Sequence, residues 1–149
     1  MEDSQLQLSN QICFPIYSVS RLITKAYTPF LDKMGITYPQ YLVLMVLWEK
    51  DGITVNQITE KLLLNTNTLS PLLKRMEKME IIKRNRCQED ERSVIIKLTQ
   101  KGKELKNQAI LIPDQLIKLL VNQNIQLEDV IQLKNMLNEW ISVLSENKE

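Results

Sequence analysis

The sequence predicts a mostly helical protein with one small β-hairpin, and three observations lead to this prediction. The 149 residues include only three glycines and few strand-like runs. The segment 64–79 carries leucine and methionine at i, i+3, i+4 and i+7 spacing, which places them on one helix face. Two strand-like runs, 81–86 and 93–98, follow directly and enclose the charged turn 87–92. A helix joined to a basic hairpin is the layout of a winged helix-turn-helix.

The first long helix is expected over residues 8–34. Pro15 lies inside this range, so the helix either begins close to it or bends there, because proline removes a backbone donor. Gly35 fits the end of the helix. Thr37 can cap a second helix that has Pro39 in its first turn. Nearly continuous hydrophobicity over 41–48 makes this second helix the expected centre of the core.

Two capped helices are expected around the helix of 64–79. Thr54 can cap a short helix that ends at Leu63, and Gln57 stands where it completes a capping box. Thr99 can cap a further helix over 100–122, which Pro113 should kink or interrupt.

A last helix is expected over about 127–144, with an apolar stripe at helical spacing. We expect one domain over 1–149, with a compact lobe at about 38–99 and flanking helices at about 8–34 and 100–145. The flanking stripes need another surface, and a second copy of the chain supplies one economically, which predicts a homodimer. The alternative is that they pack on the compact lobe.

The composition argues against a conventional enzyme. There is no histidine, which removes the common serine and cysteine triads and the usual zinc sites, and two cysteines alone cannot form a metal cage. No glycine-rich phosphate loop is present. We therefore expect no enzyme, no metal and no cofactor. The polar start and the short apolar runs predict no signal sequence and no membrane span, hence a cytoplasmic protein with reduced thiols.

Charge is concentrated in one region although the whole chain carries only +1. Residues 74–103 contain ten lysines and arginines against five acids, which leaves −4 for the rest of the chain. A positive lobe on an otherwise acidic molecule suits attraction to a polyanion, so we expect the lobe at 38–99 to bind double-stranded DNA. The alternative is a solvated charged face.

The sequence resembles a known family across nearly its whole length. LNTNTLSPLLKRMEKMEIIKR is similar to the recognition helix and wing entry of the MarR family of bacterial transcription regulators, and Asp90-Glu91-Arg92 followed by Leu98-Thr99 resembles its wing signature. ICFPIYSVSR around Cys13 and TYPQYLVL resemble the organic-hydroperoxide-resistance regulators and related thiol sensors. Asn65-Thr66-Asn67 departs from that subgroup, which usually has an acidic residue and often glycine there. That departure could change the DNA target without changing the fold.

A peroxide sensor needs a thiolate, because the thiolate is the nucleophile. Without histidine, hydroxyl donors and the positive end of a helix must stabilise it, and Cys13 near a helix start with Tyr17 one turn on suits that role. The resemblance implies that Tyr27 and Tyr38 reach Cys13 across a dimer and that oxidation there releases DNA. The alternative is that Cys13 is a small core residue.

Cys87 lies in the expected wing. Two-cysteine members of the subgroup carry their resolving thiol in the C-terminal helices, where this chain has none. The chain therefore resembles the one-cysteine type, whose sulfenic acid is trapped by a small cellular thiol. We expect Cys87 to be incidental.

The resemblance and the side-chain chemistry together predict the DNA contacts on a pseudo-palindromic operator. The recognition helix should enter the major groove, with Asn67, Thr68 and Ser70 near base edges. Lys74 and Arg75 on the same helix should contact phosphates or guanines. Arg92 of the wing, positioned by Asp90, should enter the minor groove. Arg84 and Arg86 should assist it. The alternative for Asp90 and Arg92 is a pair that only stabilises the turn. The expected DNA residues are Asn67, Thr68, Ser70, Lys74, Arg75, Arg84, Arg86, Asp90 and Arg92.

Three functional hypotheses follow. The first is a dimeric repressor that senses organic hydroperoxide or other oxidants through Cys13. The second is a MarR-type regulator controlled by a small amphipathic ligand, with Cys13 structural. The third is a winged-helix protein-interaction module that binds no DNA.

Overall fold

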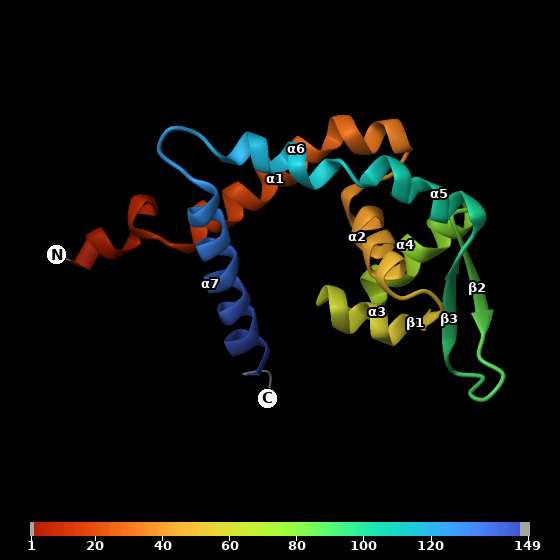
Figure 1. The fold of residues 1–149 in the computed structure, drawn as a ribbon. Helices are drawn as coiled ribbons and strands as arrows, with labels where there is room; N and C mark the ends of the chain where they lie inside the picture. The colour runs from red at the N-terminus through yellow and green to blue at the C-terminus, as the bar shows by residue number, and fades with distance from the viewer. Residues whose placement is uncertain (1, 147–149) are drawn as a thin grey trace. The chain divides into compact units, whose positions relative to one another are not determined.

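The structure is a computed structural model that describes residues 2–146 (Figure 1). The chain divides between Ile110 and Leu111 into two compact units. Within the described residues, the first unit contains five α-helices and a three-stranded sheet, and the second contains two further helices. None of the described helices is long and apolar enough to cross a membrane. The boundaries expected for a DNA-binding lobe and dimerisation helices stay predictions.

The first long helix, α1, spans Cys13–Met34 and follows two short 3-10 turns, η1 (Glu2–Leu6) and η2 (Leu8–Asn10). The expected start at residue 8 is therefore wrong, and the alternative that the helix begins close to Pro15 is confirmed. The helix begins close to Pro15, where its first turn does not need the backbone donor that proline lacks. Gly35 ends the helix in the left-handed conformation (φ 67°), as expected, and its N–H bonds the Asp32 carbonyl at 3.0 Å.

Helix α2 (Tyr38–Glu49) is the centre of the core, as predicted. Val43, Leu44 and Leu47 on this helix are at most 1% exposed. Thr37 is its N-cap, and the Gln40 side-chain oxygen accepts the Thr37 N–H at 2.9 Å. The start of α2 is thus held by a glutamine one turn into the helix.

Helices α3 (Val55–Leu62) and α4 (Thr66–Lys78) form the helix-turn-helix. The predicted Thr54–Gln57 capping box is confirmed by two bonds: Gln57 N–H to Thr54 Oγ1 at 3.2 Å and Thr54 N–H to Gln57 Oε1 at 2.9 Å. The helix expected from residue 64 begins later, because Leu63 adopts a left-handed conformation (φ 54°) and Asn65 caps α4. The predicted stripe is buried at Leu69, Leu72, Leu73 and Met76, while Met79 is half-buried at the C-cap.

The predicted hairpin is confirmed as β2 (Ile82–Arg86) and β3 (Val94–Leu98), paired antiparallel. A two-residue strand, β1 (Ile53–Thr54), pairs with the other edge of β3 and gives the order β1-β3-β2. The sequence did not indicate β1. Ile82 and Ile96 face the core and are buried, whereas alternate residues such as Lys83 face away.

Helix α5 (Gln100–Ala109) is capped as predicted, with Thr99 Oγ1 accepting the Gly102 N–H at 3.1 Å. Gly102 packs so closely against the Ile81 carbonyl that a Cβ would collide with it. The Gly102 carbonyl also accepts the Trp48 Nε1–H at 3.0 Å. These contacts fix α5 to α2 and to the segment that enters the wing.

The second unit contains α6 (Ile112–Leu120) and α7 (Leu127–Glu146). The interruption predicted at Pro113 is confirmed, because α5 ends at Ala109 and Pro113 lies in the first turn of α6. No residue of α7 is buried among those described. Several of its apolar side chains, including Leu133, Trp140 and Leu144, are 45–69% exposed in the single chain.

Candidate nucleic-acid interface and cysteine site

The polar face of α4 lies opposite its buried stripe and is open to solvent. Asn67, Thr68, Lys74 and Arg75 are exposed, and Ser70 is half-buried. The Asn65 side-chain oxygen accepts the Thr68 N–H at 2.8 Å, so the first turn is fixed from its own N-cap. The helix therefore presents hydroxyl and amide groups at its beginning and cations further along.

A small hollow of about 150 Å³ brings three of the predicted DNA residues together. Ser70 from α4 and Arg84 and Arg92 from the hairpin line it. Thr54 and Asn56 at the start of α3, Thr66 of α4 and Ser93 after the wing turn contribute further polar lining. The hairpin and the helix-turn-helix thus share one polar, positively charged surface.

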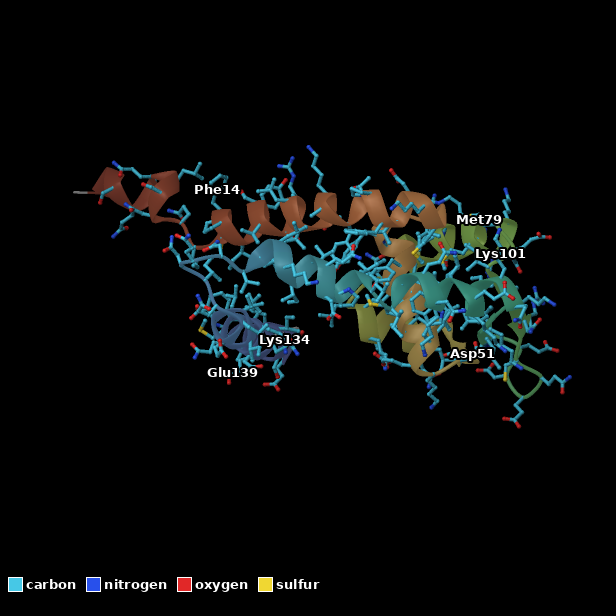
Figure 2. All side chains as sticks on the ribbon, turned by 45° about the horizontal axis from the view of Figure 1, so that its top comes forward. Phe14, Asp51, Met79, Lys101, Lys134 and Glu139 are labelled. Atoms are coloured by element: carbon cyan, nitrogen blue, oxygen red, sulfur yellow. The ribbon has the colours of Figure 1, made fainter. Side chains whose placement is uncertain are left out.

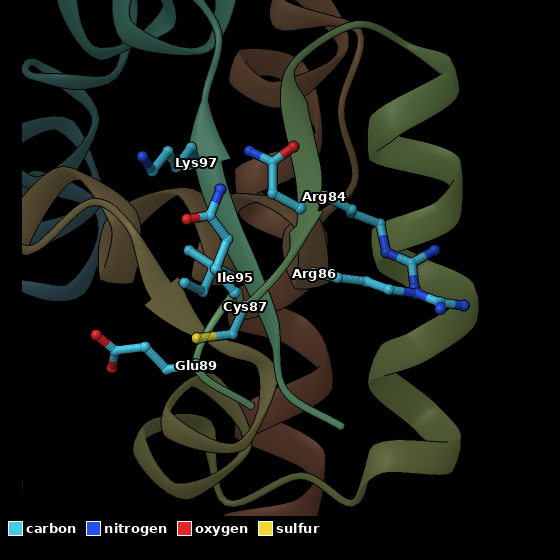
Figure 3. A pocket seen from close by; sticks show the side chains of 8 residues that line it. Arg84, Arg86, Cys87, Glu89, Ile95 and Lys97 are labelled. Carbon is cyan, nitrogen blue, oxygen red and sulfur yellow. The ribbon is translucent and has the colours of Figure 1, made fainter. Parts of the chain in front are cut away.

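Arg84 is turned toward α4 rather than away from the protein (Figure 3). The Glu77 carboxylate on α4 accepts the Arg84 backbone N–H at 3.2 Å and lies 3.9 Å from the guanidinium. The Arg84 Nε is buried and has no hydrogen-bond partner within the residues that the structure describes. Glu77 was not predicted from the sequence, although an acid on the basic face of a helix is a visible signal for such a partner.

Asp90 holds the backbone of the wing turn. Its carboxylate accepts the Arg92 N–H at 3.0 Å and the Ser93 hydroxyl at 3.0 Å. Arg92 itself is exposed. Asp90 therefore sets the position from which the Arg92 side chain leaves the turn.

Cys13 is the first residue of α1 and is exposed in the single chain. The cap of α1 offers no side-chain acceptor, so the helix start presents unsatisfied N–H groups close to this sulfur. Tyr17, one turn on, is 61% exposed, and the Arg21 guanidinium lies 5.4 Å from the centre of its ring. Apolar side chains around them, among them Phe14 and Ile16, are also exposed.

An aromatic cluster has formed where the end of α1 meets α2. The ring centres of Tyr27 and Tyr38 are 4.9 Å apart, and Tyr41 lies 5.7 Å from Tyr27 and 6.3 Å from Tyr38. Trp48 packs against Tyr41 at 6.2 Å. Tyr41 and Trp48 were not predicted as members of the site, although Tyr41 stands one helical turn after Tyr38.

Burial raises the pKa of the phenols in this cluster above the ordinary value of 10.0. Desolvation, with smaller contributions from Tyr38 and Tyr41, raises the pKa of Tyr27 to about 12. Burial also raises the pKa of Tyr38 and of Tyr41. Each phenol is protonated at neutral pH even at its ordinary pKa, and burial extends this hydrogen-bond donor form to higher pH.

The structure joins Tyr27 to Tyr38 but leaves Cys13 and Tyr17 at the other end of α1. Tyr27 lies fourteen positions after Cys13 in the same helix, which corresponds to roughly 21 Å along the axis. A Cys13 sulfur therefore cannot reach the cluster of its own chain while α1 is intact.

Cys87 is half-buried on the outer side of the hairpin, and its N–H bonds the Ser93 carbonyl at 2.8 Å. Asn85, Ile95 and Lys97 line an open depression of about 750 Å³ beside it (Figure 3). Neither cysteine forms a disulfide within the described chain. The described residues also contain no group of three or more acidic or cysteine side chains that could hold a metal.

Comparisons with known proteins agree with this geometry. The family model for transcriptional regulators SarA/Rot matches residues 25–109. The chain is 47% identical to the organic hydroperoxide resistance transcriptional regulator of Bacillus subtilis (strain 168), over 93% of this chain and 92% of that protein. Reduced AbfR bound to DNA, a Staphylococcus epidermidis protein, is 38% identical over the whole of both chains with a TM-score of 0.81. Disulfide-formed AbfR is 40% identical, with a TM-score of 0.63, over 95% of this chain and 97% of that one.

The helix-turn-helix and its adjacent basic hairpin define a winged-helix, DNA-binding transcription regulator. The chain belongs to the MarR family, in the group of organic-hydroperoxide-resistance regulators. The fold class and the family predicted from the sequence are confirmed. The relatives are transcription regulators, so the expectation that the chain is not an enzyme is confirmed as well.

Proposed function

We propose that this protein is a dimeric repressor that releases its operator when an organic hydroperoxide oxidises Cys13. The observation that carries the proposal is the separation of the two halves of the sensing site. The nucleophile lies exposed at the start of α1, and the protonated tyrosines are gathered roughly 21 Å away along the same helix. Only the Cys13 of a second chain can complete the site.

Exposed apolar surface supports the dimer. Ile12, Phe14 and Leu22 on and beside α1 are 44–66% exposed, and α7 carries its own exposed stripe. Many large exposed apolar side chains on a helix are typical of an interface, and a two-fold pair buries the same side chains of both copies. The similarity to AbfR, whose reduced form is bound to DNA in one solved structure, supports DNA binding by this chain.

DNA recognition follows from the arrangement of α4 and the hairpin. In this proposal α4 enters the major groove, with Asn67, Thr68 and Ser70 at base edges and Lys74 and Arg75 on phosphates or guanines. The exposed Arg92 enters the minor groove from the turn that Asp90 fixes. Arg86 assists from the hairpin, and Arg84 assists once it leaves Glu77. The operator is pseudo-palindromic because the protein dimer is two-fold symmetric.

The chemistry has two steps. The Cys13 thiolate attacks the terminal oxygen of the hydroperoxide, the O–O bond breaks, and the departing alkoxide takes up a proton to become an alcohol. The sulfur is thereby oxidised to a sulfenic acid and the peroxide is reduced. A small cellular thiol then attacks the sulfenic sulfur, which forms a mixed disulfide and releases water.

Oxidation changes DNA affinity by shifting a population between two arrangements of the dimer. A mixed disulfide at Cys13 adds bulk at the interface and favours a different spacing of the two recognition helices. A difference of about 1.4 kcal/mol changes the equilibrium tenfold, so a modest clash is sufficient.

One experiment distinguishes this proposal from the alternative, in which a small amphipathic ligand controls the protein and Cys13 is a structural residue. Operator binding is measured for wild type, Cys13→Ser and Cys87→Ser, before and after an organic hydroperoxide with a small thiol. Wild type and Cys87→Ser should release DNA, and Cys13→Ser should remain bound. Release by Cys13→Ser, or loss of the response in Cys87→Ser alone, contradicts the proposal.

A further inference from the structure

Among the described residues, Gln40 is the only buried side chain that carries an amide or a charge, at 4% exposure. Both ends of its amide are used. The oxygen accepts the Thr37 N–H at 2.9 Å, and Nε2 donates to the Met79 sulfur at 3.6 Å. A buried amide that loses a partner is costly, so these two bonds constrain the elements that they join.

The two ends of Gln40 belong to functionally different parts of the same compact unit. Thr37 is the cap of α2, and the next residue, Tyr38, packs against Tyr27 with tilted rings in the aromatic cluster. Met79 is the C-cap of α4, the helix that carries the DNA face. The Met79 carbonyl also accepts the Lys101 Nζ at 2.8 Å, and the two residues lie side by side in Figure 2. One buried side chain thus connects the tyrosines to the end of the recognition helix.

We propose that Gln40 is a positioning residue that couples the state of the tyrosine cluster to the placement of α4. This inference rests on the proposed function. The oxidised sulfur changes what Tyr27 and Tyr38 bond, and Tyr38 begins the helix whose cap Gln40 holds. Gln40 keeps both bonds only while the start of α2 and the end of α4 retain their relative placement. A shift at one end is therefore transmitted to the other.

Met79→Leu tests the coupling most cleanly, because it conserves volume and removes only the sulfur acceptor. Met76→Leu is the matched control, since Met76 lies one turn earlier on α4, is buried, and makes no bond to Gln40. The measured quantity is the ratio of operator Kd after hydroperoxide and thiol to Kd before. We expect Met79→Leu to keep its reduced-state Kd within about twofold while the ratio falls roughly threefold or more. Met76→Leu should keep the wild-type ratio.

Several outcomes overturn the inference. An unchanged ratio in Met79→Leu overturns it, and so does an equal fall in Met76→Leu, which would indicate general packing. A variant that only loses folding stability would weaken operator binding equally before and after oxidation, and the ratio of the two Kd values would stay unchanged. If wild type itself fails to release DNA, the proposed function is wrong and the inference falls with it. A responsive wild type beside an unaltered Met79→Leu instead contradicts the coupling alone.

A second measurement covers the case in which Met79→Leu does not fold. In wild-type protein labelled with ¹³C at the methionine methyls, oxidation of Cys13 should shift the Met79 signal. The Met76 signal should move less, because that side chain does not bond Gln40. A Met79 signal that stays unmoved while DNA is released would overturn the coupling.

Discussion

The Glu77 carboxylate on α4 holds Arg84 of the wing in two ways. It accepts the Arg84 backbone N–H at 3.2 Å, which fixes the strand, and it lies 3.9 Å from the guanidinium, which it partly neutralises. The Arg84 side chain is only 24% exposed, and its Nε has no hydrogen-bond partner within the part of the chain that the structure describes. The guanidinium is thus restrained beside the hollow that also contains Arg92 and Ser70.

Replacing Glu77 with Gln should strengthen DNA binding. The glutamine oxygen can still accept the Arg84 N–H, so the wing stays in place, while the guanidinium loses its competing charge. We expect operator affinity to rise roughly threefold to tenfold at low salt, with a salt slope steeper by about one unit for each half-site. Fluorescence anisotropy over a series of salt concentrations measures both. Equal affinity and slope would show that Arg84 does not reach DNA.

Replacing Arg92 with Ala should weaken operator binding. A guanidinium inserted in a narrow minor groove is favoured by the enhanced negative potential there. Lys74→Ala should instead reduce the salt slope by about one unit for each phosphate that the variant no longer neutralises, counted at each half-site. Lys25→Ala, an exposed lysine on α1, is the matched control and should leave both quantities unchanged. Wild-type behaviour of both test variants would place the DNA surface elsewhere.

The sequence predicted the local parts of this fold best. The Thr54–Gln57 box and the Thr99 cap depend on residues three positions apart, and both formed as expected. The predicted start of α1 at residue 8 was wrong, because Pro15 in the sequence was compatible either with a bend in a longer helix or with a helix that begins nearby. The strand β1 was missed because its two residues acquire strand character only by pairing with β3.

The site was less predictable wherever it depends on contacts distant in sequence. Tyr27 and Tyr38 were predicted from the family resemblance, whereas Tyr41 and Trp48 joined the cluster only through packing. The pairing of Arg84 with Glu77 depends on where the wing folds back against α4. The link from Gln40 to Met79 spans 39 positions and has no signal in either segment.

Replacing Asn65 with Ala should destabilise the protein. The Asn65 side chain accepts the Thr68 N–H at 2.8 Å, and loss of such a cap costs about 1 kcal/mol. Asn65→Asp keeps an acceptor at the same position and should retain most of the stability. Urea unfolding of the reduced protein measures the difference. Equal midpoints for Asn65→Ala and wild type would show that this cap contributes nothing.

The tyrosine cluster should make the folded protein sensitive to strong alkali. Because burial raises the folded-state pKa of Tyr27 to about 12 from the ordinary 10.0, the unfolded chain ionises first as pH rises. The protonated Tyr27 therefore contributes its full share to the free energy of unfolding below pH 10, and this contribution is lost progressively as the pH rises toward 12. Phenolate absorbance against pH should contain a transition near pH 12 that Tyr27→Phe removes. If the transition near pH 12 persists in Tyr27→Phe, it belongs to another phenol and the assignment to Tyr27 is wrong.

The central claim is that each sensing site combines Cys13 of one chain with Tyr27 and Tyr38 of the other. The most direct test is a purified heterodimer of a Cys13→Ser chain and a Tyr27→Phe/Tyr38→Phe chain. Each homodimer should respond poorly to an organic hydroperoxide in an operator-release assay. The heterodimer contains one complete site if the residues act across the interface, so its sulfenic acid formation and DNA release should recover. A heterodimer no more responsive than its two parents would contradict the account.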